Sequence, residues 1–243
     1  MDKDQAVLDT HIVTTPILPN GNCREDPVVD VLLEITGSDG FYDESQSRLE
    51  LKDGMGDIRF DVVCPQRWWP AGMGEQHLYE LAVSLMLNDD LVDWKRFTLG
   101  FTSVRPETKS QSGNGHGQET ILLVNGEVCE IQSVVIVDQI NEKQLLPATG
   151  DSLMLVRDHY GPDVLYQAAD RAGILMVQCV PIHPDGTPEV DVEAQIDRLA
   201  SHPSLAGWYV GHLGRISDHL ASRIRKLDPT HAVFRDFEIA PAA

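Results

Sequence analysis

The sequence lacks any apolar run approaching the roughly 20 residues that an α-helix needs to cross a bilayer, so we expect no membrane-spanning helix. Its first residues, MDKDQAVLDTHIV, lack the basic flank and apolar stretch of a signal peptide. If Met1 is the native start, this predicts a cytoplasmic protein; otherwise the location stays unknown. Basic residues are few, since 19 Lys and Arg stand against 38 Asp and Glu for a formal net charge of −19. A surface this acidic repels phosphate groups, which argues against nucleic acids and membranes as partners and leaves neutral ligands such as sugars open.

Cysteines are also few, and the four of them are widely spaced with no C-x-x-C pair, which argues against a cysteine-bound metal. Cys64, Cys129 and Cys179 lie in apolar, strand-like runs, so we expect buried, reduced thiols there. Five histidines late in the chain show no H-x-x-x-H or H-E-x-x-H spacing: His183, His202, His212, His219 and His231. The sequence therefore predicts no metal site and no cofactor.

The first hundred residues contain short strand-like segments separated by turn residues. The strands are predicted over 6–14, 28–36, 47–52, 57–64, 77–87 and 94–104. Several short strands without a convincing helix are typical of an antiparallel β-sandwich. The polar, Gly- and Ser-rich segment 106–120 follows, and we interpret it as a flexible linker or loop at a domain boundary.

After Thr120 the pattern changes to strands that alternate with helices. Three stretches place apolar residues on one helical face: Val164, Leu165, Ala168, Ala169 and Ala172 in the first, Val192, Ile196, Leu199 and Ala200 in the second, and Ile216, Leu220, Ile224 and Leu227 in the third. Gly173 stands where a helix C-cap is expected, and Pro229 ends the last helix. Repeated strand–helix units predict a parallel sheet, either open or rolled into a barrel.

The length of this second part accommodates only part of a barrel. Residues 120–243 hold about five strands, whereas a complete eight-stranded (β/α) barrel takes roughly 200 residues or more. An unfinished barrel has two open sheet edges that must be covered. The hypotheses are therefore a fragment of a longer protein, a reduced relative, or a subunit that covers its edges by forming a homo-oligomer.

Several segments occur in the order expected for one known family. Residues 67–85, RWWPAGMGEQHLYELAVSL, resemble the immunoglobulin-like middle domain of family 2 glycoside hydrolases, the β-mannosidase and β-galactosidase group. LVNGEVCEIQSVVI resembles the start of that family's catalytic barrel, and 155–181 and 202–214 resemble its second to fourth strands. The resemblance implies an immunoglobulin-like β-sandwich over 1–108, a linker over 109–119, and an incomplete (β/α) TIM-type barrel of about five strands over 120–243.

The sequence departs from the family pattern at the catalytic positions. Aligning Trp208 and Gly211 with the motif at the end of the fourth strand places His212 at the usual Asn and Leu213 at the general acid/base Glu. The family's nucleophile lies on a seventh strand, which the chain does not reach. Retaining glycosidases need two carboxyl groups about 5–5.5 Å apart, so the matched positions supply no catalytic pair. His212 is a weak candidate for proton transfer because its imidazole stands beside the lost acid.

Three other residues are candidates for carbohydrate binding. Arg157 and His159 match positions that line the family's sugar cleft, although Arg157 could instead pair with Asp158 or Asp170. Trp208 could stack on a sugar ring, but its place inside an apolar strand favours a core role by about two to one.

Two further groups favour structural roles. We expect Trp68 and Trp69 to pack against the barrel rather than bind a ligand. Asp236 and Glu238 are expected to be solvated near the C-terminus.

The leading functional hypothesis is a catalytically defective relative or fragment of a family 2 glycoside hydrolase that retains at most carbohydrate binding. The first alternative is an active β-glycosidase whose catalytic carboxylates come from another subunit or a missing segment. The second alternative is a non-enzymatic assembly module.

Overall fold

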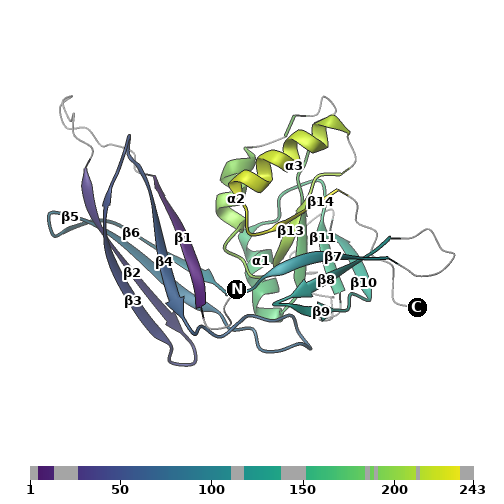
Figure 1. Ribbon diagram of the computed structural model, residues 1–243, viewed down its shortest axis with the longest axis horizontal. Helices are drawn as coiled ribbons and strands as arrows, with labels where there is room; N and C mark the ends of the chain where they lie inside the picture. The colour runs from purple at the N-terminus through teal and green to yellow at the C-terminus, as the bar shows by residue number, and fades with distance from the viewer. Residues whose placement is uncertain are drawn as a thin grey trace. The chain divides into compact units, whose positions relative to one another are not determined.

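The computed structural model describes residues 5–13, 27–110, 118–137, 152–183, 187–188, 191–211 and 214–235. The chain forms two compact units (Figure 1). The first unit comprises Met1–Gln66 and Tyr79–Leu99, and the second comprises Arg67–Leu78 and Gly100–Ala243. The short segment Arg67–Leu78 thus lies between two stretches of the first unit in sequence but belongs to the second unit.

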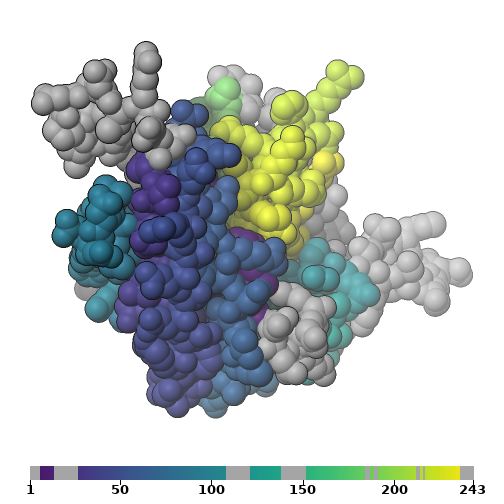
Figure 2. Space-filling model, turned by 60° about the vertical axis from the view of Figure 1, so that its left-hand side comes forward, coloured from purple at the N-terminus to yellow at the C-terminus, as the bar shows by residue number. Residues whose placement is uncertain are grey.

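The first unit consists of antiparallel β-sheets. A four-stranded sheet has the order β3-β2-β5-β6, and a two-stranded sheet pairs β1 with β4. The strands are β1 Gln5–Val13, β2 Val28–Gly37, β3 Tyr42–Glu50, β4 Met55–Val63, β5 Tyr79–Leu87 and β6 Asp90–Leu99. Burial alternates along β2, where every second residue from Val29 to Ile35 is buried. In the space-filling view, purple and blue residues of this unit lie on the side that faces the viewer (Figure 2).

Strand β6, at the edge of the four-stranded sheet, is the least buried strand of this unit. It ends at Leu99 rather than at Val104 as predicted, and only Leu99 of its ten residues is buried. The pairing of β5 with β6 is irregular between Leu85 and Met86, which is a β-bulge. A bulge together with a lysine, here Lys95, discourages an edge strand from pairing with other chains.

One cysteine expectation was wrong. Cys64 is exposed and follows the end of β4 with a left-handed φ of 54°, because the chain turns there instead of continuing the strand. Cys129 and Cys179 are buried as predicted, and burial raises the pKa of Cys129 to about 11.

The second unit contains a five-stranded parallel sheet in sequence order, β10-β11-β12-β13-β14. Its strands are β10 Ser133–Val137, β11 Ser152–Val156, β12 Leu175–Cys179, β13 Leu205–Tyr209 and β14 Ala232–Phe234. Every neighbouring pair runs parallel. The predicted alternation of strands and helices, the parallel sheet and its five strands are therefore confirmed in the part of the chain that the structure describes.

Both faces of this parallel sheet are covered. Met154 and Val156 of β11 pack in one core cluster with residues of all three helices. Leu153, which points the other way, packs with Trp68 and Leu122. The described helices thus lie on a single face of the sheet. This is expected when parallel strands follow one another in sequence order and each helical connection between them is right-handed.

A three-stranded antiparallel sheet, β7-β8-β9, also belongs to the second unit. It consists of β7 Val104–Ser110, β8 Gln118–Val124 and β9 Glu127–Cys129, and the last two join at Asn125 and Gly126. Residues 109–110 pair with 118–119, so both ends of the predicted linker are strand residues. Polar residues enter a strand readily when their backbone groups are paired in this way. The predicted boundaries at 108 and 120 stay a prediction.

The described residues form three helices, which are α1 Asp163–Ala172, α2 Val192–Leu199 and α3 Arg215–Leu227. Gly173 ends α1 in the left-handed conformation with φ 70°, which confirms the predicted C-cap. Val164 was wrongly placed on the buried face of α1. It is 54% exposed, while Tyr166 is fully buried, because Tyr166 lies three residues before Ala169 and shares its face. No helix among the described residues is long and apolar enough to cross a membrane.

Candidate functional site

The candidate site is the loop of residues 157–162 that leaves the C-terminal end of β11 and enters α1. Side chains at this end of parallel strands commonly form binding sites. Asp158 has a left-handed φ of 64°, which is uncommon for a residue other than glycine. Such conformations are frequent at functional sites, where surrounding contacts hold the backbone in place.

The structure brings the predicted residues Arg157 and His159 together in this loop. The Arg157 backbone N–H donates to Val137 O at 3.0 Å, and its exposed guanidinium pairs with Asp158 at 3.5 Å. The alternative pairing with Asp158 is therefore present, whereas Asp170 has other partners. His159 Nδ1 lies 2.8 Å from Arg157 O, and its buried Nε2 has no hydrogen-bond partner.

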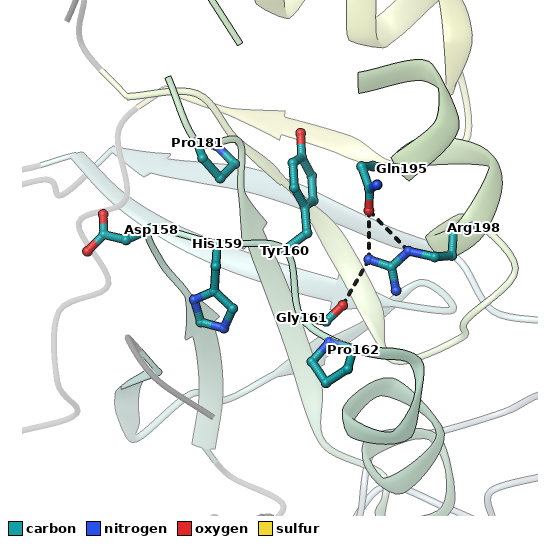
Figure 3. Close-up of a pocket in the computed structure, with 8 residues that line it drawn as sticks. All are labelled: Asp158, His159, Tyr160, Gly161, Pro162, Pro181, Gln195 and Arg198. Carbon is teal, nitrogen blue, oxygen red and sulfur yellow. Dashed lines mark hydrogen bonds between the residues drawn. The ribbon is translucent and has the colours of Figure 1, made fainter. Parts of the chain in front are cut away.

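A pocket of about 420 Å³ opens beside this loop (Figure 3). Eight residues line it: Asp158, His159, Tyr160, Gly161, Pro162, Pro181, Gln195 and Arg198. Its volume lies within the roughly 300–1,000 Å³ of small-molecule sites. In Figure 3, Tyr160 and His159 project from opposite sides of the loop, with Tyr160 extending toward Pro181 and Gln195.

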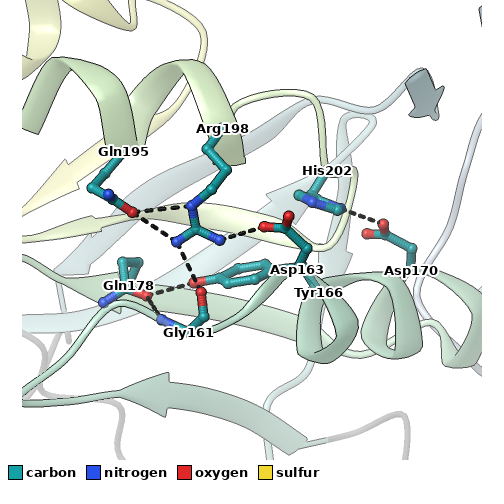
Figure 4. Close-up of polar contacts among 8 residues, drawn as sticks. All are labelled: Gly161, Asp163, Tyr166, Asp170, Gln178, Gln195, Arg198 and His202. Atoms are coloured by element: carbon teal, nitrogen blue, oxygen red, sulfur yellow. Dashed lines mark hydrogen bonds and ion pairs between the residues drawn. The ribbon is translucent and has the colours of Figure 1, made fainter. Parts of the chain in front are cut away.

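Arg198 of α2 ties the helix to the loop (Figure 4). Its guanidinium donates to Gly161 O at 2.9 Å and to Gln195 Oε1 at 2.7 and 3.0 Å, and it forms an ion pair with Asp163. The positive charge of Arg198 is thus offset by Asp163 at the first turn of α1. Sequence reasoning missed Arg198, because two of its three partners, Gly161 and Asp163, lie more than 30 positions away.

Gln178 supports the loop from within the sheet (Figure 4). It is fully buried, and its Oε1 accepts hydrogen bonds from Gly161 N at 3.1 Å and from the Tyr166 hydroxyl at 2.6 Å. Its Nε2 donates to His159 O at 2.8 Å. Sequence reasoning also missed this residue, although a glutamine inside the apolar run ILMVQCV is a detectable signal, because buried amides need several partners.

Tyr160 has a different environment from Tyr166. Its hydroxyl is buried but has no hydrogen-bond partner. Burial raises its pKa well above the usual value, although Arg198 opposes the shift, so the hydroxyl stays protonated at physiological pH. An unsatisfied buried hydroxyl costs about 1–3 kcal/mol.

Trp208 lies away from the loop and is fully buried in the core cluster that contains the helices. Its indole Nε1 donates to Asp228 Oδ2 at 2.8 Å. The structure thus gives Trp208 the core role that the sequence favoured, and its ring offers no exposed face for a sugar. Trp68 is also fully buried, and its Nε1 donates to Asp170 O at 2.7 Å, as expected for a residue that packs against the parallel sheet.

His202 and Asp170 are both buried and interact with each other, with 2.6 Å between His202 Nδ1 and Asp170 Oδ2. The other carboxylate oxygen of Asp170 accepts from Ser204 N at 3.1 Å. These contacts join α1 to the start of β13 and have a structural role. Among the described residues, no group of three or more His, Cys, Asp or Glu is arranged to hold a metal.

Several predicted candidates lie outside the described residues. They are Cys23, His212, Leu213, Asp236 and Glu238.

The two units and the polar loop at the ends of parallel strands define a protein that joins antiparallel β-sheets to an α/β unit. Residues 24–101 match the model of the family described as glycosyl hydrolases family 2. The expected resemblance is therefore confirmed: the chain is a glycosidase-like protein similar to glycoside hydrolase family 2.

Particular relatives agree with this family. The chain is 29% identical over 185 residues to β-mannosidase B of Aspergillus oryzae, covering 67% of this chain and 21% of that protein. It is 24% identical over 176 residues to an exo-β-D-glucosaminidase of Streptomyces avermitilis, covering 62% and 19%. The chain thus spans about a fifth of the length of these relatives.

Solved structures show a similar fold. The β-D-mannosidase of Dictyoglomus thermophilum superimposes with a TM-score of 0.72 at 20% identity, covering 96% of this chain and 33% of that one. The exo-chitosanase of Amycolatopsis orientalis gives a TM-score of 0.65 at 19% identity, covering 95% and 30%.

Proposed function

We propose that this chain binds carbohydrate at the C-terminal ends of its parallel strands and does not by itself hydrolyse glycosides. In this proposal the first unit is an immunoglobulin-like sandwich and the second is part of a (β/α) TIM-type barrel. The single-sided winding of the described helices and the similarity to solved family 2 structures support this architecture.

The observation that carries the proposal is the placement of Arg157 and His159 at the end of β11. The Arg157 guanidinium is 47% exposed and offers several fixed donors, which suits a ligand rich in hydroxyl groups. Its bond to Asp158 is a long 3.5 Å, so a ligand oxygen can compete for the same donors.

The lack of hydrolysis follows from the chemistry of position 213. Family 2 motifs place the general acid/base there, and a leucine side chain can neither donate nor accept a proton. The competing proposal is an active β-glycosidase that obtains its carboxylates elsewhere. It is favoured by the similarity to proteins named β-mannosidase and exo-β-D-glucosaminidase.

Binding and turnover can be measured separately on the purified chain. We expect methyl β-mannoside or methyl β-glucosaminide to bind, measured by calorimetry, and Arg157→Ala to weaken binding about tenfold through loss of charge-assisted hydrogen bonds. Arg223→Ala is the matched control, because it removes an exposed arginine of α3 instead. We expect no release of nitrophenol from the corresponding aryl glycosides; steady turnover would favour the competing proposal. No binding of either methyl glycoside would contradict the proposed function.

A further inference from the structure

The pocket beside Tyr160 is a second place where the loop can hold a ligand. The His159 side chain projects from one side of the loop, whereas Tyr160 projects from the other side toward Pro181 and Gln195 (Figure 3). The pocket is therefore bounded by the β11–α1 loop, the end of β12 and the helix α2.

The charged groups that line this pocket are already paired. Arg198 forms an ion pair with Asp163, and Asp158 forms one with Arg157. An ionised ligand would have to compete with these pairs, whereas a neutral ligand need not. The pocket thus favours a neutral occupant.

The apolar walls suit a ring with a hydrocarbon face. Pro162 and Pro181 contribute two of the walls, and the Tyr160 ring stands between Pro181 and Gln195. A volume of about 420 Å³ is enough for a small cyclic ligand such as one sugar ring.

Two polar groups of the residues that line this pocket lack a partner, His159 Nε2 and the Tyr160 hydroxyl, and Tyr160 is the one that extends toward Pro181 and Gln195 (Figure 3). Its hydroxyl makes no hydrogen bond in the structure, although buried hydroxyls almost always find one. By contrast, the hydroxyl of Tyr166 bonds to Gln178 at 2.6 Å. Because Tyr160 lines the pocket, a hydroxyl-bearing ligand there would supply the missing partner.

The surrounding backbone is held in place before any ligand arrives. Gln178 donates a hydrogen bond to His159 O and accepts one from Gly161 N, and Arg198 donates one to Gly161 O. A preformed pocket reduces the entropy lost on binding.

From these features we infer that the pocket between the β11–α1 loop and α2 is a subsite for a neutral, hydroxyl-bearing sugar ring, and that the Tyr160 hydroxyl is its recognition group. This inference rests on the proposed carbohydrate binding, to which it adds a second contact region and a specific residue.

Two matched substitutions test the inference, each removing one tyrosine hydroxyl. With methyl β-mannoside as the probe, we expect Tyr160→Phe to raise Kd about three- to tenfold, the equivalent of one hydrogen bond. Its unfolding midpoint in urea should stay equal to that of the wild type or rise, because the lost hydroxyl has no partner in the free protein. Tyr166→Phe should lower the unfolding midpoint, because it breaks a buried hydrogen bond, and change Kd by less than about threefold.

The outcomes separate this inference from the proposed function. If Arg157→Ala weakens binding but Tyr160→Phe leaves Kd unchanged, the subsite is wrong and the proposed function stands. If only Tyr160→Phe weakens binding, the subsite is supported and the role of Arg157 is wrong. A Tyr160→Phe variant that loses stability as Tyr166→Phe does, with unchanged Kd, would assign the hydroxyl a structural role and overturn the inference. If the wild type binds neither methyl β-mannoside nor methyl β-glucosaminide, the proposed function and the subsite both fail.

Discussion

Asp228 is the most strongly perturbed carboxylate that the structure describes. It accepts hydrogen bonds from Trp208 Nε1 at 2.8 Å and from the Thr230 hydroxyl at 2.6 Å, and it lies 2.8 Å from His231 Nδ1. Burial alone raises its pKa, but the hydrogen bond and charge of His231, with the bonds from Thr230 and Trp208, lower the pKa well below its usual value. The ionised form is therefore part of the folded structure at the end of α3.

Asp228→Asn is expected to destabilise the protein by about 1–3 kcal/mol at pH 7, because an amide cannot accept all of these bonds. Since the folded pKa lies below the unfolded value of about 3.9, the carboxylate stabilises the fold fully above that pH and loses its effect as the pH falls below it. Urea unfolding of both proteins at pH 7, 5 and 3 should show the difference in unfolding free energy narrowing at the lowest pH. Asp197→Asn, an exposed change on α2, is the control and should have little effect at any pH.

Single-residue contacts of this kind were only partly predictable. A tryptophan inside an apolar strand favours the core, and Trp208 is there, but nothing in the sequence pairs it with Asp228. Asp170 was considered as a partner for Arg157, whereas it bonds to His202 and Ser204. Such pairings depend on how helix and strand are placed in three dimensions, which the local pattern does not contain.

At the scale of secondary-structure elements, the end of α1 meets the segment Arg67–Leu78 closely. Ala71 N donates to Gly173 O at 2.9 Å, and Gln76 Nε2 donates to Trp69 O at 3.1 Å. A Cβ on Gly173 would overlap the backbone nitrogen of Ala71. Gly173 is thus needed both for its left-handed φ and for this close approach.

Gly173→Ala should therefore cost more than a comparable substitution in open space. Gly126, in the turn between β8 and β9, has a left-handed φ of 90°, but a Cβ added there would meet no atom within 4 Å. We expect Gly126→Ala to cost about 1–3 kcal/mol from backbone strain alone. Gly173→Ala should cost at least about 1 kcal/mol more, because backbone atoms have to shift as well. Equal free energies of unfolding in urea would show that the approach of Ala71 is unimportant.

The types of secondary-structure elements and their order were predicted from the sequence more reliably than which face of each element is buried. Gly173 and Pro229 correctly marked helix ends, because these residues restrict the backbone locally. The predicted buried face of α1 was wrong at Val164, because tertiary packing buries Tyr166 instead. At the candidate site, Arg157 and His159 were predictable from a motif. Gln178, Arg198 and Tyr160 were not, because their roles depend on burial and on partners elsewhere in the chain.

At the scale of the whole molecule, the division into two units does not follow the chain. Trp68 lies between strands of the first unit in sequence, yet it is fully buried against Leu153 and Leu175 of the parallel sheet in the second. Its hydrogen bond to Asp170 O spans 102 positions. Contacts this distant in sequence determine which unit a segment belongs to, and composition alone does not identify them.

Trp68→Ala should consequently destabilise the second unit rather than the first, whose strands β4 and β5 flank the segment Arg67–Leu78 in the sequence. Truncating a fully buried tryptophan costs about 3–5 kcal/mol through the cavity that it leaves, and here one hydrogen bond is lost as well. Hydrogen exchange followed by mass spectrometry should show faster exchange in β11, β12 and β13, with β2 and β5 unchanged. Trp94→Ala is the matched control, because Trp94 is 56% exposed on β6 and its loss should leave exchange in both units unaltered. If Trp68→Ala accelerates exchange in β2 and β5 as much as in the parallel sheet, the two units unfold together. The division of the chain into two units would then not correspond to two independently unfolding parts.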